Sequence, residues 1–296
     1  MSNNIVQSAI FVTYADVNYR DKAQVLIASL VEGGVAQDKI HIISLDDCDL
    51  RGEFKSVHQI NWSIISDIRF EKREDYFRIL PQVLIYLNDQ GHKKILYLDC
   101  DVKAYFQSID ELSAIMKGSV SAVKHNRFLL YQLLSKHPGY YNIGVNWFDF
   151  TFNETIAIVE EWNHQCSHYK DHTDPRLGYF SEQLLIDSWP NKLKYFNEIN
   201  ETVYNQAIWN TFFFHISYKN DRYCYKGNQI VFYHFSTIKY SGKFYFFAQK
   251  NSVTPILLGL RKMYIDYIHL LRDTDSFCVH KSNKSYRRLF LGHEFR

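Results

Sequence analysis

Asp99 and Asp101, two aspartates separated by a single residue, are the side chains that most clearly suggest chemistry in this sequence. They follow the apolar run KKILYL of residues 93–98, which is typical of a buried strand. Two carboxylates at the end of a strand supply hard oxygen donors, the ligands that Mn²⁺ and Mg²⁺ prefer. Such a pair also occurs by chance in solvated turns, so it is the position after a strand that favours a divalent-cation site.

The elements before this pair predict a Rossmann-like α/β domain. Short apolar runs typical of strands occur at residues 7–14, 39–45, 56–62 and 93–98. Helical spacing of apolar residues follows at 22–32 and 76–88, and Pro81 must lie in the first turn of the second helix or kink it. This alternation predicts a mainly parallel sheet flanked by helices, which binds ligands at the carboxyl ends of its strands.

The second half continues the same alternation as far as residue 245. Strands are predicted at 118–124, 143–150 and 229–236, with helices at 154–169 and 181–189 and a loop at 136–142. Residues 255–272 have a helical pattern, and the chain ends in the basic and aromatic run SNKSYRRLFLGHEFR. We therefore expect a catalytic domain over 1–245 and a C-terminal helical extension over 246–296.

Composition narrows the classes of function. The net charge of +2 over 296 residues argues against nucleic acid as a partner, because a nucleic-acid-binding domain is usually strongly basic. The five cysteines form no CxxC pair, and no stretch reaches the roughly 18 apolar residues of a membrane helix. The first residues also lack the basic and apolar regions of a signal peptide, so we expect a cytoplasmic protein.

The C-terminal segment is a candidate for peripheral contact with the inner face of an anionic membrane. Amphipathic basic segments bind such surfaces, and a solvated helix face is the alternative interpretation. The basic and apolar residues concerned are Arg261, Lys262, Tyr264, Arg287, Arg288, Phe290 and Leu291.

The segment KILYLDCDV of residues 94–102 resembles the YLDxD segment of GT-A nucleotide-sugar glycosyltransferases, in particular the family-8-type retaining enzymes that use UDP-sugars. Five other segments resemble motifs of that family in the same order, across residues 9–245. Each segment alone matches its family motif only loosely, so the evidence for the resemblance is that the segments occur in the family's order. The resemblance implies a GT-A fold, a UDP-sugar donor and Mn²⁺, or Mg²⁺, as cofactor.

Two of these segments precede the aspartate pair. The first, FVTYADVNYRDKAQVLIASL, is similar to the family's first strand and loop, which contact the base and ribose, and this assigns Asp16 and Tyr19 to the nucleotide. A helix N-cap with a packed aromatic ring is the alternative for these two residues. In EDYFRILPQVL, Arg78 matches the arginine of the YxRL helix that projects towards the nucleotide, and an ordinary ion pair is its alternative.

Two further segments follow the pair. GYYNIGVNWFDF is similar to the family's FNxGVxxxN strand, in which Asn142 would reach the donor sugar and Gly144 would allow close backbone approach. FSEQLLIDSW resembles the DQDxxN helix, with Gln183 aligned, Glu182 in place of an aspartate and Asp187 slightly displaced. In the resembling enzymes that glutamine lies beneath the anomeric carbon of the donor.

The last segment, VFYHFSTIKYSGKFY, resembles the HFxGxxKPW signature, in which the histidine completes metal coordination and the lysine binds the diphosphate. His234 and Lys239 match these positions, although the pairs at 236–237 and 240–241 depart from the family and Lys243 could substitute for Lys239. An imidazole and two carboxylates leave positions for phosphate oxygens in an octahedral site. The alternative is that His234, which lies between two aromatic residues in the sequence, is an ordinary packed side chain and not a metal ligand.

The implied reaction is transfer of a hexose from a UDP-sugar, with retention, to a glycan or lipid-linked acceptor in surface polysaccharide synthesis. The alternatives are an inverting GT-A transferase with Glu182 or Asp187 as base, and a non-catalytic glycan-binding or scaffolding module. A sugar-nucleotide pyrophosphorylase is disfavoured because residues 11–21 contain no glycine. Besides the catalytic candidates Gln183, Glu182 and Asp187 and the metal ligands Asp99, Asp101 and His234, the donor-binding residues expected are Thr13, Tyr14, Asp16, Tyr19, Arg78, Cys100, Asn142, Gly144 and Lys239.

Overall fold

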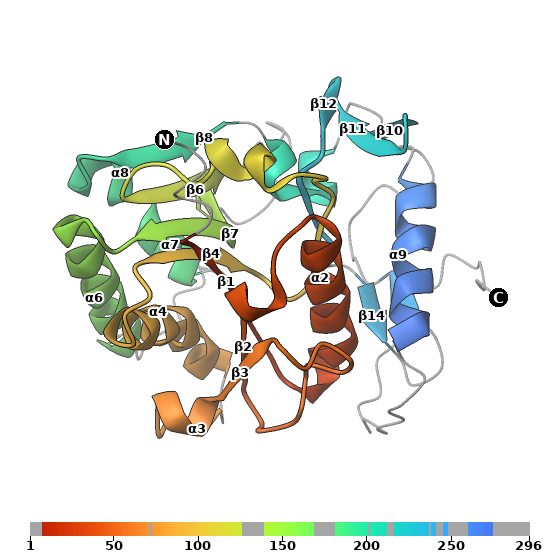
Figure 1. The fold of residues 1–296 in the computed structure, drawn as a ribbon. Coiled ribbons are helices and arrows are strands. Elements are labelled where there is room, and N and C mark those ends of the chain that lie inside the picture. Colours follow the sequence, from red (N-terminus) through yellow and green to blue (C-terminus); the bar gives the residue numbers. More distant parts are fainter. Residues whose placement is uncertain are drawn as a thin grey trace.

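A seven-stranded mixed sheet forms the centre of the molecule in the computed structural model (Figure 1). The structure describes residues 8–70, 73–125, 139–168, 181–200, 202–211, 216–236, 238–240, 245–247 and 260–274. The strand order is β3-β2-β1-β4-β7-β6-β8, and β7 runs antiparallel to both of its neighbours while every other pair is parallel. The strands are β1 (Ile10–Ala15), β2 (Ile40–Ser44), β3 (His58–Asn61), β4 (Lys94–Leu98), β6 (Val120–Lys124), β7 (Tyr141–Asp149) and β8 (Phe196–Ile199).

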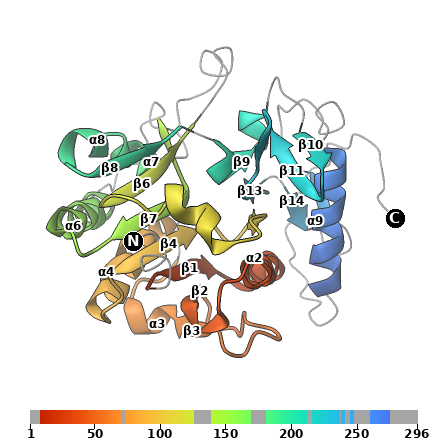
Figure 2. The ribbon, with the colours of Figure 1, turned by 45° about the horizontal axis from the view of Figure 1, so that its top comes forward.

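Helices cover both faces of this sheet, because successive residues of its buried strands are apolar and point to opposite sides. Phe11 and Leu96 pack with α2 in one core cluster, and Val12 and Ile95 pack with α4 and α6 in another. Figure 2 shows α2 on one side of β1 and α4 and α6 on the other. The helices are α2 (Arg20–Glu32), α3 (Trp62–Ile65), α4 (Ile79–Asp89), α6 (Asn153–His168), α7 (Ser181–Ile186), α8 (Trp189–Lys192) and α9 (Arg261–Thr274). Short 3₁₀ turns are η1 (Val17–Tyr19), η2 (Gln37–Lys39), η3 (Arg73–Arg78), η4 (Ile109–Ala114), η5 (Thr202–Asn205) and η6 (Ile208–Asn210).

Three small sheets flank the central one. The sheet β5-β13-β9 contains β5 (Val102–Ala104), β13 (Phe232–His234) and β9 (Gln206–Ala207). The other two are β10 (Ile216–Lys219), β11 (Arg222–Tyr225) and β12 (Asn228–Gln229), and the pair β14 (Ile238–Tyr240) and β15 (Tyr245–Phe247).

Helix α9 packs beside α2, as both views of the ribbon show (Figures 1 and 2). Its Tyr267 ring stacks on Phe235 with 3.8 Å between ring centroids, and Tyr264 meets the same ring edge-on at 5.2 Å. These rings belong to a third core cluster that joins α9 to β13. The helix expected within residues 255–272 is therefore present over its described part, while the boundary expected at residue 245 stays a prediction.

Most of the expected elements agree with the structure, with three informative differences. The single strand expected over 229–236 is divided, since Gln229 ends β12 and β13 covers Phe232–His234. Strand β7 begins at Tyr141, so Asn142 lies in the strand and not in the expected loop, because the two residues pair with Lys124 and Val123 beyond a register shift that leaves extra residues in β7. The helix expected over 181–189 is divided into α7 and α8. Pro81 is the third residue of α4, in the first turn, where its missing N–H removes no hydrogen bond.

Among the described residues, no helix combines the length and the apolar character needed to cross a membrane. Arg287, Arg288, Phe290 and Leu291 of the segment considered for membrane contact lie outside the described residues.

Candidate metal and donor site

Asp99 and Asp101 lie at the carboxyl end of β4, in a tight turn between β4 and β5. The backbone N–H of Asp99 donates to the carbonyl of Gly144 on β7 at 2.8 Å, and the N–H of Val102 donates to the carbonyl of Asp99 at 3.0 Å. These bonds fix the turn at both ends. The two carboxylates therefore project from a rigid part of the sheet edge, as the sequence predicts.

His234 reaches the same place through strand pairing. Strand β13 pairs antiparallel with β5 so that His234 lies opposite Val102, the residue directly after Asp101. The N–H of Phe235 donates to the carbonyl of Asp101 at 2.8 Å, which extends the ladder beyond the strands. A residue far along the sequence is thus held beside the aspartate pair by backbone hydrogen bonds.

The three side chains converge on one point. Nε2 of His234 lies 2.9 Å from Oδ1 of Asp101 and 3.5 Å from Oδ2 of Asp99. One ligand atom from each residue falls within 4.8 Å of the other two, a spacing that could hold a metal ion. Two carboxylate oxygens and an imidazole nitrogen suit Mn²⁺ or Mg²⁺ and leave further positions in the coordination sphere.

Gly144 makes room for the imidazole. A Cβ at this position would lie 2.7 Å from Nδ1 of His234 and 2.8 Å from Oδ1 of Asn142, closer than real Cβ contacts allow. On the other side, the ring of Trp209 meets the imidazole edge-on with centroids 5.3 Å apart. These neighbours hold the ring with Nε2 towards the carboxylates, so the donor set fits a divalent cation.

The charges at the site are strongly coupled. Burial raises the pKa of Asp99, and the nearby Asp101 adds to that increase. Burial also acts to raise the pKa of Asp101, but the positive charges of His234 and Lys22 outweigh it and hold this pKa well below its ordinary value. Burial alone would lower the pKa of His234, yet the two aspartates raise it. The two carboxylates thus favour the protonated form of the imidazole, and a bound cation would take the place of that proton.

Two residues that sequence reasoning missed orient the aspartates. The hydroxyl of Tyr97 donates to Oδ1 of Asp99 at 2.6 Å, and the ring of Tyr14 stacks on Tyr97 with centroids 5.7 Å apart. Nζ of Lys22 lies 3.5 Å from Oδ2 of Asp101. A signal for Tyr97 existed, because residues two apart in a strand share a face. No sequence signal pointed to Lys22, because this residue lies on α2 and its partner Asp101 follows β4.

The predicted base-binding residues lie next to the site but are engaged within the protein. Oδ1 of Asp16 accepts from the backbone N–H groups of Asn18 at 2.9 Å and of Tyr19 at 3.2 Å, and so caps η1. The ring of Tyr19 packs against the core cluster beneath α2. The alternative interpretation, a cap with a packed aromatic, is therefore observed, and the nucleotide contacts stay predictions.

Asn142 is adjacent to the metal ligands, and its amide is used internally. Its Oδ1 accepts from the N–H of Gly144 and from Nδ2 of Asn205, both at 2.6 Å, and its Nδ2 lies 2.9 Å from Nε2 of His125. The side chain is buried. In this structure Asn142 therefore shapes the start of β7, and a contact with a donor sugar stays a prediction.

The candidate catalytic residues lie on or just after α7, which packs against β7. Gln183 is buried, and its Oε1 has no hydrogen-bond partner among the described residues. Oδ1 of Asp187 accepts from the N–H of Tyr140 at 2.7 Å, so this carboxylate holds the residue before β7. The side chain of Glu182 lies outside the described residues, as do the side chain of Lys239 and the whole of Lys243.

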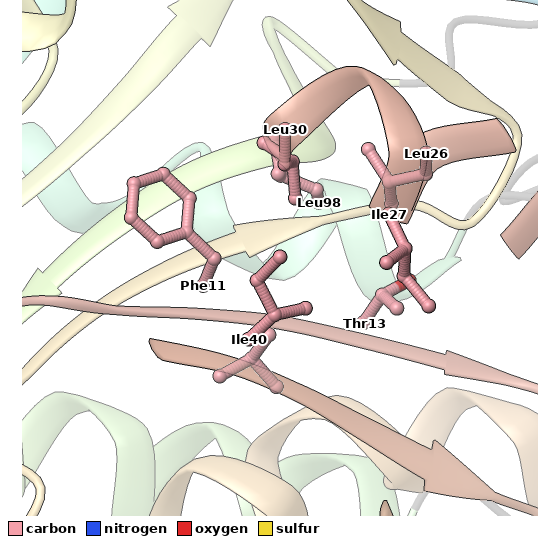
Figure 3. Close-up of a pocket in the computed structure, with 8 residues that line it drawn as sticks. Phe11, Thr13, Leu26, Ile27, Leu30, Ile40 and Leu98 are labelled. Atoms are coloured by element: carbon pink, nitrogen blue, oxygen red, sulfur yellow. The ribbon is translucent and has the colours of Figure 1, made fainter. Parts of the chain in front are cut away.

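The remaining predicted residues occupy varied surroundings. Figure 3 shows Thr13 in a narrow apolar pocket between β1 and α2, beside Phe11 and Ile27, where its hydroxyl is buried without a hydrogen-bond partner among the described residues. Cys100 packs partly buried against the same core, and burial raises the pKa of its thiol. Arg78 directly precedes α4, with its Nε buried and likewise unpaired within the described part of the chain.

Solved structures share this arrangement of the chain. The glycosyltransferase GlyE of Streptococcus pneumoniae TIGR4 is similar with a TM-score of 0.52 at 15% identity, over 94% of this chain and 66% of GlyE. The fold is that of GT-A glycosyltransferases. No protein-family model matches the sequence, and no curated protein matches it either. At this identity the likeness concerns the fold, and chemistry must come from the site.

Two further solved enzymes are similar at lower scores. Galactosyltransferase LgtC, solved with donor and acceptor sugar analogs, has a TM-score of 0.47 at 16% identity, over 76% of this chain and 86% of LgtC. Mouse xyloside xylosyltransferase 1 has a TM-score of 0.48 at 14% identity, over 76% of this chain and 96% of that enzyme.

Proposed function

We propose that this protein is a metal-dependent glycosyltransferase that transfers a hexose from a UDP-sugar, with retention, to a glycan or lipid-linked acceptor in surface polysaccharide synthesis. The observation that carries the proposal is the convergence of Asp99, Asp101 and His234 at the carboxyl end of β4. Ligands bind at this edge in open α/β sheets. The ordered resemblance of six sequence segments to family-8-type enzymes supports the donor class and the stereochemistry.

The chemistry expected of the site is release of a nucleoside diphosphate. Asp99, Asp101 and His234 would hold Mn²⁺ or Mg²⁺, which supplies Lewis-acid stabilisation of the leaving diphosphate. The rigid turn between β4 and β5 and the ladder between β5 and β13 keep these three ligands in position before the donor arrives. Such preorganisation lowers the cost of stabilising developing charge.

Retention fits the part of the site that the structure describes. The carboxylate of Asp187 is bound to the backbone of Tyr140, and the amide of Gln183 is buried nearby on α7. An amide is a poor base, so a retaining transfer in which the departing diphosphate accepts the acceptor's proton needs neither side chain as a base. Proton NMR of the product's anomeric centre tests this directly, since inversion would assign a base role to Glu182 or Asp187.

The experiment that tests the activity is Mn²⁺-dependent release of UDP from a panel of UDP-sugars by the purified chain. We expect release that EDTA abolishes and Mn²⁺ restores. Asp99→Asn and Asp101→Asn should each lower the rate by about a hundredfold or more, because each removes a charged ligand worth several kcal/mol. Asp221→Asn, in the turn between β10 and β11, is the matched control and should leave the rate unchanged.

Two results would contradict this function. Equal rates for wild type and the Asp99→Asn, Asp101→Asn double variant would remove the aspartate pair from the reaction. Absence of turnover together with absence of UDP and Mn²⁺ binding would instead favour the non-catalytic glycan-binding module.

A further inference from the structure

Lys22 is a buried cation inside the candidate donor site. It is the third residue of α2, and only 7% of its surface is exposed. Its Nζ lies 3.5 Å from Oδ2 of Asp101 and 5.0 Å from the centroid of the Tyr19 ring. A lysine this buried is almost always well paired, whereas the contact of Lys22 with Asp101 is at the long end of the hydrogen-bond range.

The hydrogen bonds of Lys22 are incomplete. An ammonium group carries three N–H donors, and those of a buried group are normally paired. Among the described residues Asp101 is the one hydrogen-bond acceptor of Nζ, at the upper end of the hydrogen-bond range. Donors therefore remain for a ligand that enters between Tyr19, predicted to contact the base, and Asp101, predicted to bind the metal.

The charge of Lys22 also opposes tight binding of a bare metal ion. Asp101 has one oxygen towards His234 and the other towards Lys22, so a cation must share this carboxylate with an ammonium. Like charges at such short range repel strongly where little water screens them. An anion that arrives with the cation reverses the sign of this interaction, because Lys22 then faces negative oxygens.

We propose that Lys22 is a donor-binding residue that couples the two ligands of the site: its ammonium weakens binding of the free divalent cation and stabilises the diphosphate of a cation–nucleotide complex. The inference rests on the proposed function and adds to it a residue to which the resemblance assigns no role, although Lys22 lies within the first matched segment. It makes the cation a ligand that enters with the nucleotide diphosphate and leaves with it.

The test compares wild type with Lys22→Met, which keeps the length of the side chain and removes its charge, and with Lys22→Arg, which keeps the charge. Mn²⁺ binding without nucleotide is followed by electron paramagnetic resonance, and UDP and UMP binding at saturating Mn²⁺ by calorimetry. For Lys22→Met we expect severalfold tighter Mn²⁺ binding and about tenfold weaker UDP binding, in line with loss of one charge-assisted hydrogen bond. UMP affinity should change little, and Lys22→Arg should resemble wild type.

The proposal requires both changes in Lys22→Met, the tighter binding of Mn²⁺ and the weaker binding of UDP. Lys22→Met with unaltered Mn²⁺ affinity, or with an unaltered ratio of UDP to UMP affinity, would overturn the role of Lys22 and leave a structural ion pair. Lys22→Gln serves as a second neutral variant if Lys22→Met does not fold, as judged by thermal unfolding. If wild type binds both Mn²⁺ and UDP, a negative result concerns Lys22 alone, whereas wild type that binds neither removes the proposed function itself.

Discussion

Gly144 and His234 are in such close contact that the histidine ring occupies the space where any other residue at position 144 would place its Cβ, 2.7 Å from Nδ1. The backbone φ of Gly144 is not in the left-handed region, so the backbone conformation does not require a glycine here. The close approach of the imidazole is what requires it. Strand β7 and strand β13 therefore meet at the metal ligands without an intervening side chain.

Gly144→Ala should displace the imidazole and weaken Mn²⁺ binding at least about tenfold, with a loss of about 1–3 kcal/mol in the free energy of unfolding from overpacking. Mn²⁺ titration and chemical denaturation measure the two effects. The double variant Gly144→Ala, His234→Ala should recover part of the lost stability but not the metal affinity, because the clash with the imidazole disappears together with the ligand while the close approach to Oδ1 of Asn142 remains. Additive losses in the double variant would show that the two residues do not clash.

Tyr97→Phe should lower Mn²⁺ affinity by about three- to tenfold, because Asp99 loses the hydrogen bond that fixes its carboxylate. Metal titration monitors this effect. Tyr225→Phe is the matched control, since the Tyr225 hydroxyl donates to the carbonyl of Asn210 at 2.7 Å, away from the aspartates. If both variants bind Mn²⁺ like wild type, Tyr97 does not position the ligand.

Binding of Mn²⁺ should release a proton from His234. Asp101 and Asp99 raise the pKa of this histidine, so it stays protonated over a wider pH range than usual, and a metal can bind only the neutral imidazole. Mn²⁺ affinity should therefore increase as the pH rises through that pKa, which lies above the ordinary histidine value of about 6.5. Calorimetry in buffers of different ionisation enthalpy counts the protons released. A heat of binding that is independent of the buffer would argue against His234 as a ligand.

Acid should destabilise the fold through His41, which lies on β2 far from the metal ligands in the sequence. Burial, followed by the charges of His92, His58 and Lys39, lowers the pKa of His41 to about 3. Since the unfolded chain binds the proton more tightly, stability is complete above the unfolded pKa of about 6.5 and is lost progressively down to pH 3.

From this shift we expect the free energy of unfolding to fall by about 2 kcal/mol between about pH 7 and 5 because of His41 alone. Denaturant titrations at several pH values provide the measurement. His41→Gln should flatten the slope, while His164→Gln, at an exposed position of α6, should retain it. An unchanged slope in His41→Gln would place the acid sensitivity elsewhere.

The aspartate pair could be found from the sequence because its signal is local: a short apolar strand followed at once by two acids. His234 could be found only by resemblance, since nothing between β5 and β13 in the sequence predicts that the two strands pair. Lys22 escaped prediction for the same reason, as its burial depends on a carboxylate from another element. The pattern predicts a loop at Asn142, and the register shift between β6 and β7 beyond which Asn142 pairs with Val123 has no clear sequence signal.

The antiparallel pairing of β5 with β13 has a consequence for biosynthesis. Two of the three ligands leave the ribosome together, while the third belongs to a strand that is made much later and joins the molecule from outside the central sheet. A nascent chain that has already built β1 to β8 therefore lacks the imidazole, so the proposed cation site would be complete only when β13 has docked. A metal ion bound after that step would link β13, through His234, to Asp99 and Asp101 between β4 and β5.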